Sequence, residues 1–120
     1  MAPKKILIVD DEVDLVDTVR FPLEIEGYGV LVAYNGEDAL NQARKENPDL
    51  ILLDLMLPKL DGYKVCRLLK FDERYKHIPI LMLTAKSQEK DKVIGMETGA
   101  DEYITKPFDV DYLMKKVRNT

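Results

Sequence analysis

The sequence contains one cysteine, one histidine and no tryptophan. Because Cys66 has no second cysteine to pair with, an intramolecular disulfide is excluded, and a reducing, cytoplasmic location is the simplest expectation. The single His77 excludes a metal site built from several histidines. We expect Cys66 to pack within a helix and His77 to lie on the surface or in a loop.

Long hydrophobic runs and an excess of positive charge are also missing. No apolar stretch approaches the ~18 residues of a membrane-spanning helix, and the apolar run Ile6–Val9 is too short for the core of a signal peptide. Acidic residues number 22 against 18 basic ones, which gives a formal net charge of −4. Because phosphate contacts are made mainly by lysine and arginine, we expect no direct nucleic-acid binding by this domain. The lack of a long apolar stretch leads us to expect no membrane partner.

The 120 residues predict one domain, spanning 1–120, with a core that needs no disulfide or structural metal. Short apolar segments alternate five times with segments of helical periodicity. Strands are expected over 5–9, 30–34, 50–57, 78–83 and 101–105, each followed by a helix, the fourth of them over about 88–98. This order predicts an α/β fold, a doubly wound five-stranded parallel sheet with helices on both faces.

Several residues mark the expected helices. Gly27 is expected to end the first helix, Asn35 to cap the second and Asp109 to cap the last. The third helix carries Val65, Leu68 and Leu69 at helical spacing.

The run Leu50–Pro58 is continuously apolar apart from Asp54. Such a run predicts a strand that is buried on both faces of a parallel sheet. A buried carboxylate without partners costs several kcal/mol, so Asp54 is expected at the open end of this strand and beside a cation. The alternative for this segment alone is an aspartate that merely begins a turn.

Polar side chains stand at matching ends of four predicted strands, namely Asp10 and Asp11, Asp54, Thr84 and Lys106. Ligands of such sheets bind at the carboxyl ends of the strands. Two carboxylates ~4 Å apart repel by about 4 kcal/mol at an effective dielectric near 20, and an all-oxygen ligand set favours Mg²⁺ or Mn²⁺ as the counterion. A metal, an ammonium and a hydroxyl suit a transferring phosphoryl group, for which a carboxylate is a competent nucleophile.

Each of these residues has a second interpretation. Asp11 can cap the first helix, Lys106 can be a solvated loop charge, and Thr84 can simply end a strand. Their joint occurrence at one edge of the predicted sheet favours a site.

Five segments carry a family resemblance: Ile8-Val9-Asp10-Asp11-Glu12, Asp54-Leu55-Met56-Leu57-Pro58 with Asp61-Gly62, Leu83-Thr84-Ala85, Gly99-Ala100-Asp101 through Tyr103, and Lys106-Pro107-Phe108. In this combination, and over essentially its whole length, the chain resembles the receiver domains of two-component response regulators. The resemblance implies a chemotaxis-regulator-like, flavodoxin-like sheet with strand order 2-1-3-4-5, and a cis Lys106–Pro107 bond.

The resemblance also implies a site. Asp54 would take a phosphoryl group from a histidine kinase or phosphotransfer protein. Asp11, Asp54 and the Met56 carbonyl would ligate Mg²⁺ (or Mn²⁺), with Asp10 contributing mainly through water. Lys106 and Thr84 would contact the phosphoryl oxygens, and Tyr103 would be the aromatic partner of Thr84 in the conformational switch.

The implied function is that of a signalling phosphoacceptor, which catalyses its own phosphorylation and dephosphorylation and is not otherwise an enzyme. The switch is expected at the face of the fourth helix, fifth strand and last helix. A phosphorylation-dependent homodimer through this face is also expected, because Asp101 and Glu102 share it with three cations, Lys115, Lys116 and Arg118.

Three alternatives belong to other classes. An FMN-binding module would need a Ser/Thr/Gly-rich phosphate loop where this chain has acidic residues. A phosphatase with an aspartyl nucleophile would usually carry a second aspartate where Met56 stands. A receiver-like docking module would work without phosphorylation, and the intact set of acids, threonine and lysine argues against it.

Overall fold

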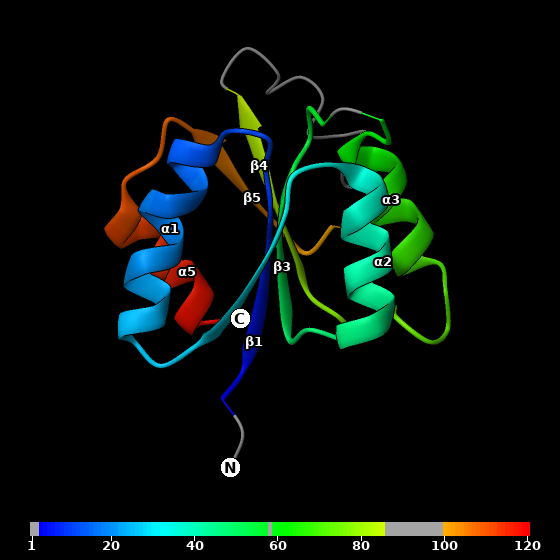
Figure 1. The fold of residues 1–120 in the computed structure, drawn as a ribbon, viewed down its shortest axis with the longest axis horizontal. Helices are drawn as coiled ribbons and strands as arrows, with labels where there is room; N and C mark the ends of the chain where they lie inside the picture. Colours follow the sequence, from blue (N-terminus) through cyan, green and yellow to red (C-terminus); the bar gives the residue numbers. More distant parts are fainter. Residues whose placement is uncertain (1–2, 58, 86–99) are drawn as a thin grey trace.

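The computed structural model describes residues 3–57, 59–85 and 100–120. Within these residues the elements follow the expected alternation (Figure 1): β1 (Lys5–Val9), α1 (Val13–Ile25), β2 (Gly29–Ala33), α2 (Gly36–Glu46), β3 (Leu50–Asp54), α3 (Gly62–Lys70), β4 (Ile80–Ala85), β5 (Glu102–Lys106) and α5 (Val110–Arg118). The fourth helix, expected over about 88–98, lies outside the described residues. None of the described helices is long and apolar enough to cross a bilayer.

The five strands form one parallel sheet in the order β2-β1-β3-β4-β5, which confirms the predicted topology. β1 lies between β2 and β3, so that Ile8 is paired with Val32 on one side and with Leu52 on the other. All of β3 is buried, as its apolar sequence predicts for a strand covered on both faces. The strand order reverses between β1 and β3, which is where a doubly wound sheet binds its ligand.

Helices cover both faces of the sheet, with α1 and α5 on one side and α2 and α3 on the other (Figure 1). On the α1–α5 side the core contains Ile8, Val16 and Leu113, among others. The buried hydrophobic residues on the α2–α3 side, which include Leu53 and Val65, form a second cluster. We call this cluster the α2–α3 core. Each large aliphatic side chain that is fully buried contributes about 1.5–3 kcal/mol.

Local signals set the ends of the helices, and those at Gly27, Asn35 and Asp109 were expected. The side chains of Asn35, Asp61 and Asp109 cap α2, α3 and α5 by accepting hydrogen bonds from backbone amides in the first turn. Gly27 follows α1 with a φ of 95°, and Asn47 ends α2 with a φ of 47°, both in the left-handed region. The Lys106–Pro107 bond is cis, as the family resemblance implies.

The structure corrects several expected boundaries. Both ends of β2 lie one residue earlier than expected, and β4 begins two residues later than expected, at Ile80. β3 stops at Asp54, so residues 55–57 belong to a loop. Lys106 is the last residue of β5 and does not follow it. On α3, Leu69 is buried but Leu68 is 47% exposed. Cys66 is buried in α3 and His77 lies in an exposed turn, as expected.

Candidate functional site

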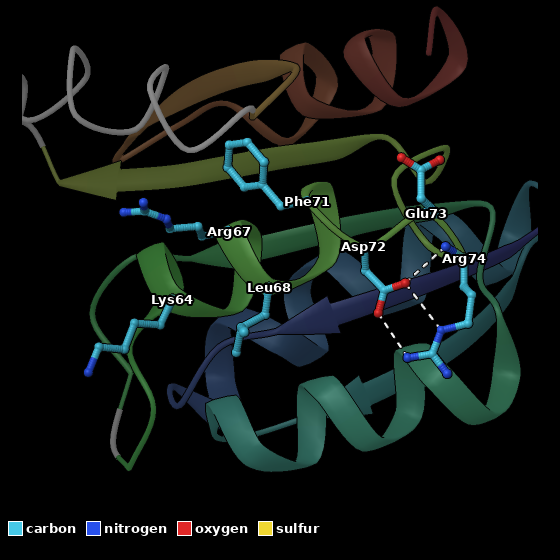
Figure 2. A pocket seen from close by; sticks show the side chains of 7 residues that line it. All are labelled: Lys64, Arg67, Leu68, Phe71, Asp72, Glu73 and Arg74. Atoms are coloured by element: carbon cyan, nitrogen blue, oxygen red, sulfur yellow. Dashed lines mark hydrogen bonds and ion pairs between the residues drawn. The ribbon is translucent and has the colours of Figure 1, made fainter.

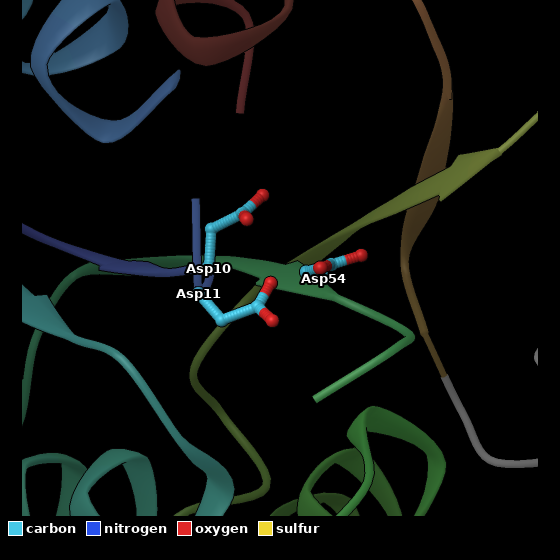
Figure 3. Close-up of side chains that lie close together, drawn as sticks. All are labelled: Asp10, Asp11 and Asp54. Atoms are coloured by element: carbon cyan, nitrogen blue, oxygen red, sulfur yellow. The ribbon is translucent and has the colours of Figure 1, made fainter. Parts of the chain in front are cut away.

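Three aspartates from two strand ends converge at the carboxyl edge of the sheet. Asp10 and Asp11 directly follow β1, and Asp54 is the last residue of β3. One carboxylate oxygen from each lies within 4.8 Å of the others (Figure 3). Asp10 and Asp54 are buried, whereas Asp11 is exposed. The group can hold a metal ion, since hard divalent cations are bound by oxygen ligands of this kind.

Asp54 occupies an unfavourable position for a negative charge. Burial, followed by the neighbouring charge of Asp10, raises the pKa of Asp54 from 3.8 to about 6, although Lys106 and the Met56 amide act against the rise. The Met56 amide donates a hydrogen bond to Asp54 Oδ1 at 3.3 Å. The carboxylate thus lacks full compensation from the protein, and an additional cation would stabilise its charged form.

Lys106 brings a positive charge into this cluster from the end of β5. Its Nζ donates to Asp10 Oδ2 at 2.7 Å and lies 3.6 Å from Asp54 Oδ1 and 3.7 Å from Glu12 Oε1. Burial alone would lower the pKa of this ammonium, but the hydrogen bond to Asp10 and the charge of Asp54 outweigh it and the pKa lies above its ordinary value. Lys106 is therefore bound most closely to Asp10 and only loosely to Asp54.

Thr84 stands on β4 next to this edge of the sheet. It is fully buried, and among the described residues its Oγ1 is a buried side-chain oxygen without a hydrogen-bond partner. Such a hydroxyl costs about 1–3 kcal/mol until a partner reaches it. Leu83, its neighbour, is paired with Asp54 across the sheet. The hydroxyl is thus free to bond a group that arrives at the site.

Tyr103 lies on β5, one strand further along the sheet. Its ring is partly buried and packs against the α2–α3 core. Burial, with smaller contributions from Cys66 and Tyr63, raises the pKa of the Tyr103 phenol to about 12, so the ring stays neutral in the physiological range. Tyr103 is thus a neutral, partly buried ring beside the α2–α3 core.

The structure excludes one alternative interpretation and adds two contacts that sequence reasoning missed. Asp11 does not cap α1, because the N-cap residue is Glu12 and no side chain completes the cap. Asp10 instead accepts a hydrogen bond from the Glu12 amide at 3.0 Å, which fixes the turn after β1. A glycine that permits close backbone contact was also overlooked: a Cβ on Gly62 would lie 2.3 Å from the Asp54 carbonyl oxygen. Only the glycine itself signals this contact in the sequence.

A hollow in the described surface lies elsewhere, lined by residues of α3 and of the turn after it (Figure 2). Its lining includes the exposed Leu68 and Phe71, and Asp72 and Arg74 form an ion pair at 2.9 Å along its edge. Its lining does not include the site residues, namely Asp10, Asp11, Asp54, Thr84 and Lys106. The chemistry predicted from the sequence therefore belongs to the sheet edge and not to this hollow.

Comparison with known proteins agrees with this geometry. Residues 6–118 match the response regulator receiver domain family. The chain is 56% identical over 105 residues to the alkaline phosphatase synthesis transcriptional regulatory protein PhoP of Bacillus subtilis, a match that covers 88% of this chain and 43% of that protein. The chain thus spans less than half the length of this relative.

Solved structures also share the fold. A putative response regulator from Chloroflexus aurantiacus has a TM-score of 0.91 and 39% identity, with 98% of this chain and 96% of that chain covered. The chemotaxis response regulator CheY4 of Vibrio cholerae has a TM-score of 0.91 and 32% identity, with 98% of each chain covered.

Proposed function

Since the chain belongs to the response regulator receiver domain family, and is a signalling domain of two-component systems, we propose that Asp54 is its phosphoryl acceptor. The observation that carries the proposal is the position of this carboxylate. It is buried at the end of β3, within 4.8 Å of two further carboxylates and 3.6 Å from the Lys106 ammonium. Thr84 supports the same assignment with a hydroxyl that has no partner among the described residues.

In the proposed reaction, an Asp54 carboxylate oxygen attacks the phosphorus atom of a phosphohistidine. The new O–P bond forms as the P–N bond breaks, which leaves an acyl phosphate on Asp54 and returns the electron pair to the imidazole of the donor. The donor is a histidine kinase or a phosphotransfer protein. Lys106 and the Thr84 hydroxyl would bind the phosphoryl oxygens, so their contribution would be to position the group and stabilise its charge.

The donor set fits a hard divalent cation, which we propose to be Mg²⁺ or Mn²⁺. Asp11, Asp54 and the Met56 carbonyl would ligate the ion, with Asp10 acting mainly through water. Within the described residues the cluster holds three carboxylates and the Lys106 ammonium. Because the closest partner of Lys106 is Asp10, the negative charge of Asp11 and Asp54 is only partly compensated. When bound, the ion supplies charge neutralisation for the transferring group.

We further propose that the signal leaves the site through Thr84 and Tyr103. A phosphoryl oxygen offers the Thr84 hydroxyl an acceptor, and Tyr103 then turns into the space that Thr84 vacates. Only differential contacts of this kind can bias a two-state equilibrium. The outcome is a change at the face that includes β5 and α5, where a dimer partner or an output domain would respond.

Charges on that face partly pair within the chain. Lys116 lies 3.4 Å from Glu102, Arg118 lies 2.6 Å from Glu26, and Asp101 accepts a hydrogen bond from Lys70. A phosphorylation-dependent homodimer through this face would therefore have to exchange these contacts for contacts between copies.

The decisive experiment is incubation with a small phosphodonor and Mg²⁺, followed by intact mass measurement. We expect one added phosphoryl group on the parent and none on Asp54→Asn. Asp17→Asn, an exposed change on α1, is the matched control and should label as the parent does. Full stoichiometric labelling of Asp54→Asn would exclude this acceptor, and an unlabelled parent would favour a docking module that works without phosphorylation.

A further inference from the structure

We infer that Gly36, the first residue of α2, is a positioning residue for the site at Asp54. It holds in place the β3–α3 loop, by which we mean residues 55–57 and 59–61. This inference rests on the proposed function, because its consequence is read out in metal binding. The loop matters because it starts next to Asp54 and contains Met56, whose carbonyl is the proposed ligand.

The inference starts from a backbone contact between Gly36 and Leu60. A Cβ atom on Gly36 would lie 1.8 Å from the Leu60 carbonyl oxygen, 2.7 Å from the carbonyl carbon and 2.8 Å from the Leu60 Cβ. Ordinary contacts of a Cβ atom begin at 3.4 Å. Only glycine therefore lets the start of α2 and the loop approach this closely.

The α2 side of this contact is firmly fixed. The Asn35 side chain accepts a hydrogen bond from the Asp38 amide at 2.9 Å, which caps the helix. Ala39 and Ala43 are buried in the α2–α3 core, and Gln42 Nε2 donates to the Val32 carbonyl of β2 at 2.6 Å. A side chain at position 36 would consequently be accommodated by movement of the loop and not of the helix.

The β3–α3 loop connects Leu60 to the residues of the site. Its base is closed by the Gly62 amide, which donates to the Leu55 carbonyl at 3.0 Å. Met56 lies in the chain between Leu55 and Leu60 and is 64% exposed. Its amide donates to Asp54 Oδ1 at 3.3 Å. A loop displaced at Leu60 therefore shifts the Met56 peptide relative to the Asp54 carboxylate.

The size of the effect follows from the tolerance of metal sites. Ligands must be held within about 0.5 Å of their productive positions, and loss of an orienting contact outside the ligand shell typically costs 10–100-fold in metal affinity. A methyl group on Gly36 requires the Leu60 carbonyl to move by more than an ångström. We expect Gly36→Ala to weaken metal binding by about tenfold.

The test compares Gly36→Ala with Gly29→Ala in the full chain, using Mn²⁺ as the probe. A Cβ on Gly29 would meet no atom closer than 3.8 Å, so this control has the same composition without the clash. Free Mn²⁺ is counted by electron paramagnetic resonance. The dissociation constant should rise about tenfold for Gly36→Ala and stay unchanged for Gly29→Ala. Equal affinity in both variants overturns the inference.

A second readout needs no metal. Backbone NMR of the metal-free protein should show shifted Met56 and Asp54 amides in Gly36→Ala but not in Gly29→Ala. Val117→Ala, which opens a cavity under α5, lowers stability without touching the loop and should leave both readouts unchanged. Metal affinity that falls equally in Val117→Ala would mean that Gly36 acts only through stability.

Two further outcomes remain decisive. If Gly36→Ala does not fold, Leu60→Ala removes the side chain that packs against the α2–α3 core and tests whether holding the loop at Leu60 controls metal binding. It should weaken Mn²⁺ binding, and unchanged binding overturns the inference. If the parent itself binds no Mn²⁺, the proposed metal site fails, and the metal-free amide shifts alone decide whether Gly36 positions the loop.

Discussion

Lys106 determines how charge is distributed between the two buried aspartates. Its ammonium donates to Asp10 at 2.7 Å, a charge-assisted hydrogen bond, and lies 3.6 Å from Asp54. Asp10 therefore takes most of the available positive charge. Burial and the neighbouring acidic groups still disfavour the charged form of Asp54. This explains why the pKa of Asp54 rises even though a cation is close by.

The raised pKa of Asp54 predicts a pH-dependent stability difference. The folded protein binds this proton near pH 6 and the unfolded chain near its ordinary 3.8, so ionisation of Asp54 disfavours folding. In metal-free buffer, Asp54→Asn should raise the free energy of unfolding by roughly 1–2 kcal/mol at pH 7.5. The gain should shrink as the pH falls from 6 towards 3.8 and vanish below about 3, where the parent is protonated in both states.

Urea unfolding at several pH values measures this difference. Asp17→Asn, at an exposed position on α1, is the control and should show no pH-dependent gain. A difference between parent and Asp54→Asn that grows toward low pH would have the opposite sign and would contradict a raised pKa.

At this scale the sequence predicted which polar residues stand at this edge of the sheet, because strand ends are set by short apolar runs. Asp10, Asp11, Asp54, Thr84 and Lys106 all lie at the edge where they were expected. Individual partners were not predictable. The preference of Lys106 for Asp10, and the close contact of Gly36 with Leu60, depend on distances between segments that are remote in the sequence.

At the level of the element, α3 shows how helical periodicity leaves the buried face ambiguous. Val65, Leu68 and Leu69 fit a helical stripe in more than one phase, since i+3 and i+4 neighbours both share a face. In the structure α3 is rotated so that Cys66 and Leu69 face the α2–α3 core. Leu68 is instead 47% exposed and lines the hollow (Figure 2).

Two adjacent leucines of α3 therefore make a matched pair. Leu69→Ala should lower the free energy of unfolding by about 2–4 kcal/mol, because it removes a fully buried side chain and leaves a cavity. Leu68→Ala, the same change on the exposed side, should cost less than about 1 kcal/mol. Chemical denaturation of both variants checks this. Equal losses would mean that α3 packs in the phase that the sequence first suggested.

Strand boundaries were predicted less well than strand order. The order follows from the family resemblance, and β2-β1-β3-β4-β5 is observed. The boundaries depend on which backbone groups pair across the sheet. Thr84 with Thr105 and Ala85 with Lys106 extend β4 and β5 beyond their apolar runs. Hydrophobic pattern alone cannot show pairing between polar residues.

For the whole molecule, the site exists only because the sheet brings distant segments together. Asp10 and Lys106 are separated by 96 positions in the chain yet share a hydrogen bond. Asp11 follows β1 and Asp54 ends β3, on the two strands between which the strand order reverses. The clustered charge is thus a property of the folded state, and a cation that binds the cluster must stabilise folding.

Magnesium should therefore raise the melting temperature, by an amount that mass action fixes. At ten times its dissociation constant, an ion that binds only the folded chain adds about 1.4 kcal/mol, or roughly 5 °C for a domain of this size. Asp11→Ala removes a proposed ligand that is exposed, so it should abolish the shift without unfolding the chain. Asp17→Ala should keep it. Calorimetry across a Mg²⁺ series decides the matter, since a parent curve that does not move in millimolar-range Mg²⁺ rules out the metal site.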